Sequence, residues 1–233
     1  MIRLYELCGQ DRNRRFSPYV WRTRLALHHK GLAYESVPVR FVEKDAFAES
    51  GSKTVPVIQE DGRWVADSWR IACYLEDHYP DRPSLFGGAT GRAHARFINA
   101  WTDRTLVLGL FPLLAARIWT LLDPESQAYF RESREARLGM TLEEAGRDRE
   151  AKLKALRRAL SPLEATLKAQ DFLGGTAPSY ADYIVAGPLI WAAITGDFDP
   201  LDPESAVARW RGRIFSLYDG LVASAVAAAT DTS

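Results

Sequence analysis

The order of strand and helix signals along the chain is the feature that most constrains its fold. Residues 2–7 alternate apolar and polar side chains, as a half-buried strand does. Pro18 opens a helical run that Gly31 closes, the usual placement of these residues at helix ends. Residues 34–39 indicate a second strand. Strand, helix and strand in this order predict a βαβ unit with parallel strands and a right-handed crossover.

The following segment predicts two more strands and a helix. Residues 41–54 are polar, with a short helix expected around Lys44 to Glu49. Apolar runs at residues 55–58 and 64–66 flank an Asp61-Gly62 pair, which is typical of a β-hairpin. A helix then begins at residues 67–68 and runs to His78. The first part of the chain is therefore predicted to be an α/β unit of order βαβ-ββα.

Strand signals end near residue 90. Helical patterns cover residues 91–122, 124 to roughly 160, and 163–170. Residues 131–158 are rich in Glu, Arg and Lys, which suits exposed helix faces on which oppositely charged side chains four residues apart form ion pairs. Ser179, followed three residues later by Asp182, is close to a capping box before an apolar run. Glycines and prolines interrupt the pattern between residues 82 and 90. We predict two domains, residues 1–82 and an all-α domain of residues 90–233.

The charge balance argues against a nucleic-acid binder. Lys plus Arg equals Asp plus Glu at 30 each, so the basic excess of such proteins is missing. Arg12, Arg14 and Arg15 form either a local basic patch or part of a solvated loop. The sequence contains no apolar run long enough to span a membrane and no signal-peptide core. We expect a cytoplasmic protein with neither nucleic acid nor membrane as partner.

The cysteines and histidines do not form a metal-binding pattern. Cys8 and Cys73 fit neither a disulfide framework nor a zinc motif. His28 and His29 are adjacent on a predicted helix, so their side chains point about 100° apart and would chelate poorly. No metal is expected.

Ser17 lies where the first strand gives way to the first helix. The free N–H groups and the partial positive charge of a helix start favour an anion. A hydroxyl is too weak an acid to become that anion, but it can donate a hydrogen bond to a ligand's thiolate and so lower the pKa of that thiol. The alternative is that Ser17 only caps the helix.

Two further segments can likewise be interpreted either as part of a ligand site or as ordinary structural features. Pro56 cannot donate to a strand ladder, and in a cis state it would expose the backbone groups of Val55 to a peptide ligand. Otherwise it is an ordinary trans proline at a sheet edge. Asp67 and Ser68 begin a helix, where a carboxylate could bind and Asp67 could receive an ammonium. Simple capping is again the alternative.

Taken together, these motifs resemble a known family. Residues 17–20, Ser-Pro-Tyr-Val, are similar to the Cys-Pro-Tyr-Cys turn of glutaredoxins with both cysteines lost. Residues 54–58, the Asp67-Ser68 pair and the helical second half resemble the cytosolic glutathione S-transferases. Residues 17–27, 30–31 and 79–83 more closely resemble the bacterial β-etherases, serine-type members that cleave β-aryl ethers of lignin fragments with glutathione. The resemblance implies a thioredoxin-like N-terminal domain, an all-α C-terminal domain and a homodimer.

The resemblance also implies a role for each position. Ser17 matches the catalytic serine, and glutathione is the co-substrate. The residues implied to bind glutathione are Ser17, Lys53, Thr54, Val55, Pro56, Asp67 and Ser68. Among them, Val55 would pair with the cysteinyl part through its backbone, Pro56 would be the cis-proline, and Asp67 and Ser68 would hold the γ-glutamyl end. Thr54 stands where many relatives carry Lys or Arg, and Lys53 is the candidate substitute for that charge.

The second substrate is expected to be a hydrophobic, aromatic electrophile that the thiolate attacks, with β-aryl ethers as candidates. The helix beginning near residue 93 should face the first domain, which gives five pocket candidates: Tyr19, Trp101, Phe111, Pro112 and Trp119. Two alternatives remain open. One is a non-catalytic protein that binds glutathione or another ligand, and the other is a glutathione-dependent isomerase or dehalogenase.

Overall fold

A four-stranded mixed sheet forms the first part of the computed structural model, which describes residues 1–230. The strands are β1 (Ile2–Leu7), β2 (Tyr34–Val39), β3 (Val57–Glu60) and β4 (Arg63–Ala66), in the order β2-β1-β3-β4. β1 and β2 are parallel, and β3 is antiparallel to β1 and β4. The predicted βαβ-ββα order is confirmed. Asp61 and Gly62 both have positive φ in the hairpin, as a two-residue type I′ turn requires.

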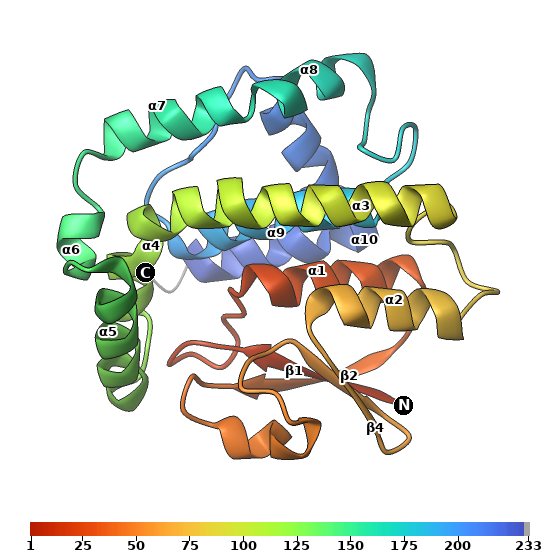
Figure 1. Cartoon of the computed structure of the whole chain (residues 1–233), viewed down its shortest axis with the longest axis horizontal. Coiled ribbons are helices and arrows are strands. Elements are labelled where there is room, and N and C mark those ends of the chain that lie inside the picture. The colour runs from red at the N-terminus through yellow and green to blue at the C-terminus, as the bar shows by residue number, and fades with distance from the viewer. Residues whose placement is uncertain (231–233) are drawn as a thin grey trace.

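Helices cover both faces of this sheet. α1 (Pro18–His29) and α2 (Ser68–His78) lie on one face, and the short 3₁₀ helix η1 (Lys44–Ser50) lies on the other (Figure 1). Beneath η1, a small core of Tyr5, Val39, Phe47 and Val57 closes its side of the sheet. The face of the sheet covered by α1 instead belongs to a much larger hydrophobic core, which continues into the second half of the chain.

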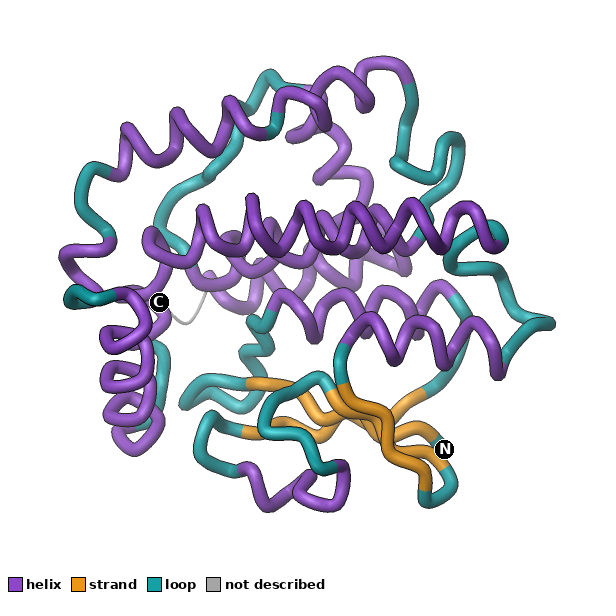
Figure 2. The backbone as a smooth tube through the Cα atoms, in the orientation of Figure 1, coloured by secondary structure: helices purple, strands orange, loops and turns teal. Residues whose placement is uncertain are grey.

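The second half is entirely helical, as Figure 2 shows. Its elements are α3 (Ala89–Thr102), the π-helix η2 (Asp103–Val107), α4 (Leu108–Thr120), α5 (Pro124–Leu138), α6 (Leu142–Ala145), α7 (Arg149–Ala159), α8 (Ser161–Ala169), α9 (Tyr180–Thr195) and α10 (Ala206–Thr230). Residues 231–233, the end of the predicted helical domain, lie outside the described residues. No helix within residues 1–230 is both long and apolar enough to cross a membrane.

Two of the long predicted helices are broken. The pattern at 91–122 contains the π-helical turn η2, and the pattern at 124–160 divides into α5, α6 and α7. Gly139 ends α5 with φ +71°, and Asp148 precedes α7 with φ +54°. A residue with positive φ cannot continue a right-handed helix, so the chain turns at both places. The helical periodicity on either side gave no sign of these turns.

α9, rather than α3, is the helix of the second half that packs against α1. The helix near residue 93 also faces the first domain, as expected, but it meets α2: Arg92 pairs with Asp77 at 2.6 Å, and the Arg96 guanidinium lies over the Trp69 ring. Gly187 explains the close approach of α9 to α1, because a Cβ placed there would lie only 2.4 Å from the carbonyl oxygen of Pro18. The predicted capping box is confirmed: Asp182 accepts from the N–H of Ser179, and also from the indole of Trp210 on α10 at 2.9 Å.

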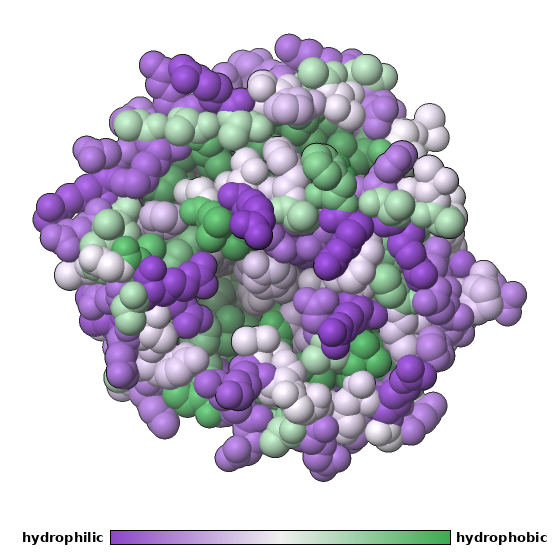
Figure 3. All heavy atoms as spheres, viewed as in Figure 1, coloured by the Kyte–Doolittle hydropathy of each residue, from purple (hydrophilic) through white to green (hydrophobic). Residues whose placement is uncertain are grey.

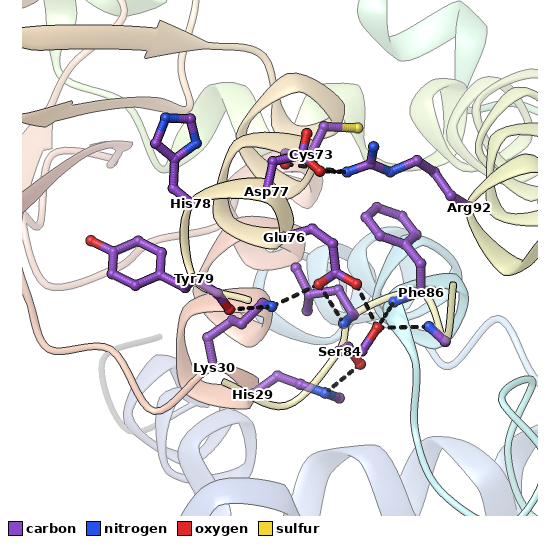
Figure 4. A network of polar contacts seen from close by, with 12 residues as sticks. His29, Lys30, Cys73, Glu76, Asp77, His78, Tyr79, Ser84, Phe86 and Arg92 are labelled. Carbon is purple, nitrogen blue, oxygen red and sulfur yellow. Dashed lines mark hydrogen bonds and ion pairs between the residues drawn. The ribbon is translucent and has the colours of Figure 1, made fainter. Parts of the chain in front are cut away.

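A buried polar network ties the end of α1 to α2 and to the segment that leads into α3 (Figure 4). Lys30 is 1% exposed, and its Nζ lies 2.7 Å from Oε2 of Glu76 and 3.2 Å from the carbonyl oxygen of Tyr79. Glu76 also accepts from the Ser84 hydroxyl and, at 2.9 Å, from the N–H of Leu85. This buried ion pair and its hydrogen bonds are therefore one of the contacts that hold the connection between the two halves in place.

Candidate functional site

A cavity of about 740 Å³ lies between the sheet unit and the helical half. Its lining comes from the start of α1, the β2–η1 connection, the loop before β3, the start of α2, and from η2, α4, α5 and α9. Figure 3 shows a hollow on this face with hydrophobic atoms inside and hydrophilic side chains around it. A volume of this size suits one or two small-molecule ligands.

Ser17 lies at the N-terminus of α1 and lines this cavity. It is 5% exposed, and its Oγ accepts a long hydrogen bond of 3.4 Å from the N–H of Val20. Within residues 1–230 no acceptor is found for the Ser17 hydroxyl proton. A hydroxyl can accept and donate at the same time. The capping role is therefore real, and it leaves the O–H free to donate to a ligand.

The peptide bond between Val55 and Pro56 is cis, as the resemblance implied. The Pro56 carbonyl accepts from the N–H of Asp67 at 3.1 Å, which joins this loop to the start of α2. Within the described residues neither the N–H nor the C=O of Val55 has a hydrogen-bond partner. Both residues line the cavity, so Val55 offers one backbone donor and one acceptor to an extended peptide.

Asp67 and Ser68 meet the same cavity at the N-terminus of α2. Asp67 has φ +81°, and its Oδ1 accepts from the N–H groups of Trp69 and Arg70 at 3.1 Å each. Ser68 is 2% exposed. The predicted alternative of capping thus describes Asp67, yet its exposed carboxylate keeps lone pairs for a ligand ammonium.

Positive charge predominates in the cavity lining. Lys53 and Thr54 are exposed at one end, and the Ser52 hydroxyl holds this loop by donating to the Thr54 carbonyl at 2.7 Å. The lining cations are Arg40, Lys44, Lys53, Arg70, Arg134 and Arg137, against two acids, Asp67 and Asp103. Asp103 is already paired with Arg22, a fully buried residue of α1, at 2.8 Å. The cavity is therefore suited to an anionic ligand.

Aromatic rings make up much of the cavity lining. Of the five predicted pocket residues, Tyr19 and Phe111 line the cavity. The rings that the sequence analysis missed are Phe16, Phe41, Phe47, Tyr129, Phe130 and Trp191. Trp191 stacks on Phe111 at 6.2 Å between ring centroids. Trp191 lies within an apolar run of α9 that the sequence shows only as core, so no local signal distinguishes it.

Trp101, Pro112 and Trp119 are not among the residues that line the cavity. Trp101 belongs to α3, which packs on α9. Pro112 follows Phe111 directly and so points about 100° away from it around α4. The Trp119 indole donates to the carbonyl of Gln127 at 3.2 Å and is covered by a guanidinium of α5. These three residues therefore do not belong to the pocket.

The protein's own thiols are poorly placed for chemistry. Cys8 is fully buried, and burial raises its pKa to about 11. Burial also raises the pKa of Cys73, and neither thiol lines the cavity. A reactive sulfur in this cavity has to come from a ligand. Within residues 1–230 no group of three His, Cys, Asp or Glu side chains is arranged to hold a metal ion.

The arginines before Ser17 each have a partner, and the loop is exposed to solvent at residues 10–13. Arg12 pairs with Glu43, and the buried Arg14 donates to the carbonyl of Ala229 at 2.6 Å. Arg15 donates to the Ser36 hydroxyl at 3.1 Å. Each guanidinium therefore anchors the loop that precedes Ser17 and positions it at the start of α1.

Solved structures of other proteins share this fold. The chain matches glutathione transferase GSTFuA3 of Phanerochaete chrysosporium with a TM-score of 0.77 and 31% identity, over 98% of this chain and 96% of that one. A glutathione S-transferase of Ceriporiopsis subvermispora in complex with glutathione matches with a TM-score of 0.76 and 26% identity, over 99% of this chain and 96% of that one.

Sequence comparison agrees with the structural match. Glutathione transferase GST 23 of Zea mays is 27% identical over 213 residues, which are 86% of this chain and 82% of the relative. Residues 16–78 match the family model for the glutathione S-transferase N-terminal domain. Residues 93–215 match the model for the C-terminal domain, so the two models together cover most of the chain. The chain therefore belongs to the glutathione S-transferase family.

Proposed function

We propose that the protein binds glutathione along residues 1–82 and holds its sulfur as a thiolate beside the Ser17 hydroxyl. The cysteinyl backbone pairs with Val55, and the γ-glutamyl carboxylate and ammonium meet Ser68 and Asp67. Lys53 is the candidate partner of the glycyl carboxylate. The glutathione-bound relative supports the choice of ligand.

The observation that carries this proposal is the free hydroxyl proton of Ser17 at the start of a twelve-residue helix. A hydrogen bond from Ser17 and the helix N-terminus both favour the charged form of a nearby thiol, so the thiol pKa falls below about 8.5. The thiolate is the nucleophilic form of the sulfur. A non-catalytic binder would gain little from a donor at this place.

The reaction is displacement at an electrophilic carbon held against the aromatic wall of residues 90–233. The sulfur forms a bond to that carbon, the leaving group departs with its electron pair, and no oxidant is needed. Holding both reactants in one cavity makes the attack effectively intramolecular, which contributes more than the lowered pKa. Cleavage of β-aryl ethers is one such reaction, in which an aryloxide leaves.

Replacement of Ser17 tests the assignment. Ser17→Ala should lower kcat/KM for glutathione and an aryl halide about 100-fold, as loss of one anion-stabilising donor does, and the bound thiol pKa should rise toward about 8.5. Glutathione affinity should change little. Calorimetric titration of glutathione and the pH dependence of single-turnover rates measure these quantities.

Two further variants separate the hydroxyl from the helix cap. Glycine caps a helix nearly as well as serine, so Ser17→Gly should lose activity as fully as Ser17→Ala. Ser17→Thr keeps the hydroxyl and should keep most of the rate. Equal rates in all four proteins would refute the role of Ser17, and turnover of no electrophile by the wild type would favour a binding protein.

The cytoplasmic location, the homodimer and the β-etherase subtype remain predictions. A panel of β-aryl ethers, aryl halides and isomerisable substrates with product identification distinguishes ether cleavage from the isomerase or dehalogenase alternative, because all of these share the glutathione site.

A further inference from the structure

α5 brings an unusual set of side chains to the cavity. It extends beside the sheet unit and packs against α4 (Figure 1). Tyr129, Phe130, Arg134 and Arg137 of this helix line the cavity. Their spacing places them along one side of α5. Most of the charge-rich stretch is exposed, as expected, whereas Arg134 is half-buried and lines the cavity.

The rings near α5 form a continuous row. Phe41 lies 5.4 Å from Phe130, Phe130 lies 6.4 Å from Phe111, and Phe111 lies 6.2 Å from Trp191, all between ring centroids. Aromatic pairs at such separations attract each other through their edges and faces. A planar aromatic ligand would extend this row inside the cavity.

Arg134 stands over this row without a carboxylate. Its guanidinium carbon lies 5.1 Å from the Phe130 ring centroid and 5.5 Å from that of Phe41. Its Nη1 donates to the Ser133 hydroxyl at 3.0 Å, and no ion-pair partner is found for it within residues 1–230. Burial lowers the pKa of Arg134, which is the expected effect of removing water from a cation that no carboxylate compensates.

Two cations near Arg134 have partners of their own. Arg131, one turn before Arg134 on the same helix, pairs with Glu135 and Glu143. Lys44 donates to the Tyr129 hydroxyl at 3.2 Å, and this hydrogen bond lowers the pKa of that tyrosine. Carboxylates are thus present on α5, yet within the described residues none of them forms an ion pair with Arg134.

We propose that the second substrate is an aromatic anion, whose ring packs against the row of Phe41, Phe130, Phe111 and Trp191 and whose carboxylate or similar group binds Arg134. This inference rests on the proposed function, because it names the electrophile of the same site. The two carboxylates of glutathione have other partners there, at Ser68 and Lys53. Arg137, over Phe111 at 5.4 Å, adds a second positive charge at the cavity rim.

A matched pair of electrophiles tests the substrate class. One is a chlorodinitrobenzoate with chlorine para to the carboxylate, and the other is the corresponding neutral benzamide. In both, glutathione sulfur bonds to the ring carbon and chloride leaves with the C–Cl electron pair. Because a charged hydrogen bond contributes about 1.5–3 kcal/mol, Arg134→Gln should lower kcat/KM for the benzoate about 10- to 100-fold. The benzamide rate should change less than about twofold, as expected for an unused contact.

Two control variants sharpen the result. Arg131→Gln removes a charge from the same helix outside the cavity lining and should leave the benzoate-to-benzamide ratio at the wild-type value. Arg134→Lys should recover part of the benzoate rate, since it restores the charge without the planar fork. KM for glutathione should be the same in all four proteins.

Three outcomes would overturn the inference: equal losses for both electrophiles in Arg134→Gln, a raised KM for glutathione in place of a changed ratio, or the same change in Arg131→Gln. If the wild type turns over neither electrophile, the proposed function fails on its own. The affinity of a chlorine-free dinitrobenzoate for the glutathione-saturated protein, measured by calorimetry, then still tests whether Arg134 binds an aromatic anion. Loss of that binding in Arg134→Gln supports it, and unchanged binding refutes it.

Discussion

Glu76 shows how one side chain can determine the stability of the junction between the two halves. It lies within hydrogen-bond distance of Lys30, which is 1% exposed, and it also accepts from Ser84 and Leu85 (Figure 4). Glu76→Gln should cost about 3–5 kcal/mol, because the buried ammonium of Lys30 loses its counter-charge. Denaturant unfolding followed by circular dichroism measures the loss.

Asp77→Asn is the matched control. Asp77 is the next residue on α2, and its pair with Arg92 is far more exposed, with side-chain exposures of 58% and 34%. Exposed pairs contribute about 0–1 kcal/mol. A similar loss of stability in both variants would show that burial of Lys30 is not what makes Glu76 important.

The same pair predicts how stability depends on pH. Burial raises the pKa of Glu76, but the hydrogen bonds from Lys30, Ser84 and Leu85 lower it, and the net result is a pKa below the ordinary 4.5. A carboxyl with a depressed folded-state pKa contributes stability above its unfolded-state pKa and loses it as pH falls through the folded-state value. The difference in stability between wild type and Glu76→Gln should therefore narrow as pH falls below about 4.5. A difference that stays constant down to acid unfolding would contradict this.

At the level of single residues, the sequence predicted those site positions that local structure fixes. Ser17, Pro56 and Asp67 each stand at the start of a helix or strand, and the residue types preferred at such starts can be recognised in the sequence. Arg134 and Trp191 line the same cavity, but only because α5 and α9 are placed beside it. Their neighbours in the sequence resemble those of any exposed or buried helix, so no local pattern could select them.

At the level of elements, the contact between α1 and α9 positions the start of α1, where Ser17 lies. A Cβ on Gly187 would lie 2.4 Å from the Pro18 carbonyl oxygen, and backbone at that distance has to move. Gly187→Ala should destabilise the protein by about 1–3 kcal/mol and lower kcat more than it raises KM for glutathione, because Ser17 immediately precedes the displaced residue. Thermal unfolding and steady-state kinetics measure the two effects.

Gly212→Ala in α10 provides the comparison. No atom lies within 4 Å of a Cβ placed there, and alanine is favoured over glycine in a helix by about 0.5–1 kcal/mol. This variant should therefore be as stable as the wild type or more so, with unchanged kinetics. Destabilisation of equal size in both variants would show that the close approach at Gly187 is not the cause.

The elements of the first half were easier to predict than those of the second. β1, β2 and α2 begin and end at the predicted residues or within one of them, because prolines, glycines and alternating apolar residues mark their ends. In the second half, α5, α6 and α7 merge into one periodic pattern in the sequence. The turns at Gly139 and Asp148 let α6 and α7 pack against α4, and periodicity alone does not encode that packing.

At the level of the whole molecule, the two halves share one hydrophobic core. Trp21 and Leu25 of α1 belong to the same buried cluster as Ile184 and Trp210 of the helical half. The fully buried Arg22 of α1 also donates to the carbonyl of Ile184 at 3.2 Å. Neither half can separate from the other without exposing apolar surface and a buried guanidinium.

This shared core predicts one cooperative unfolding transition rather than two. The seven tryptophans include Trp21 in the first half and Trp210 in the second, and both are fully buried. Tryptophan fluorescence and far-ultraviolet circular dichroism should therefore give coincident thermal curves. The calorimetric enthalpy should equal the van't Hoff enthalpy, at roughly 160 kcal/mol near 60 °C for a chain of this size. A first transition that exposes Trp21 while helicity persists would show instead that the helical half is stable without α1, and the cavity would then be assembled from two units that fold independently.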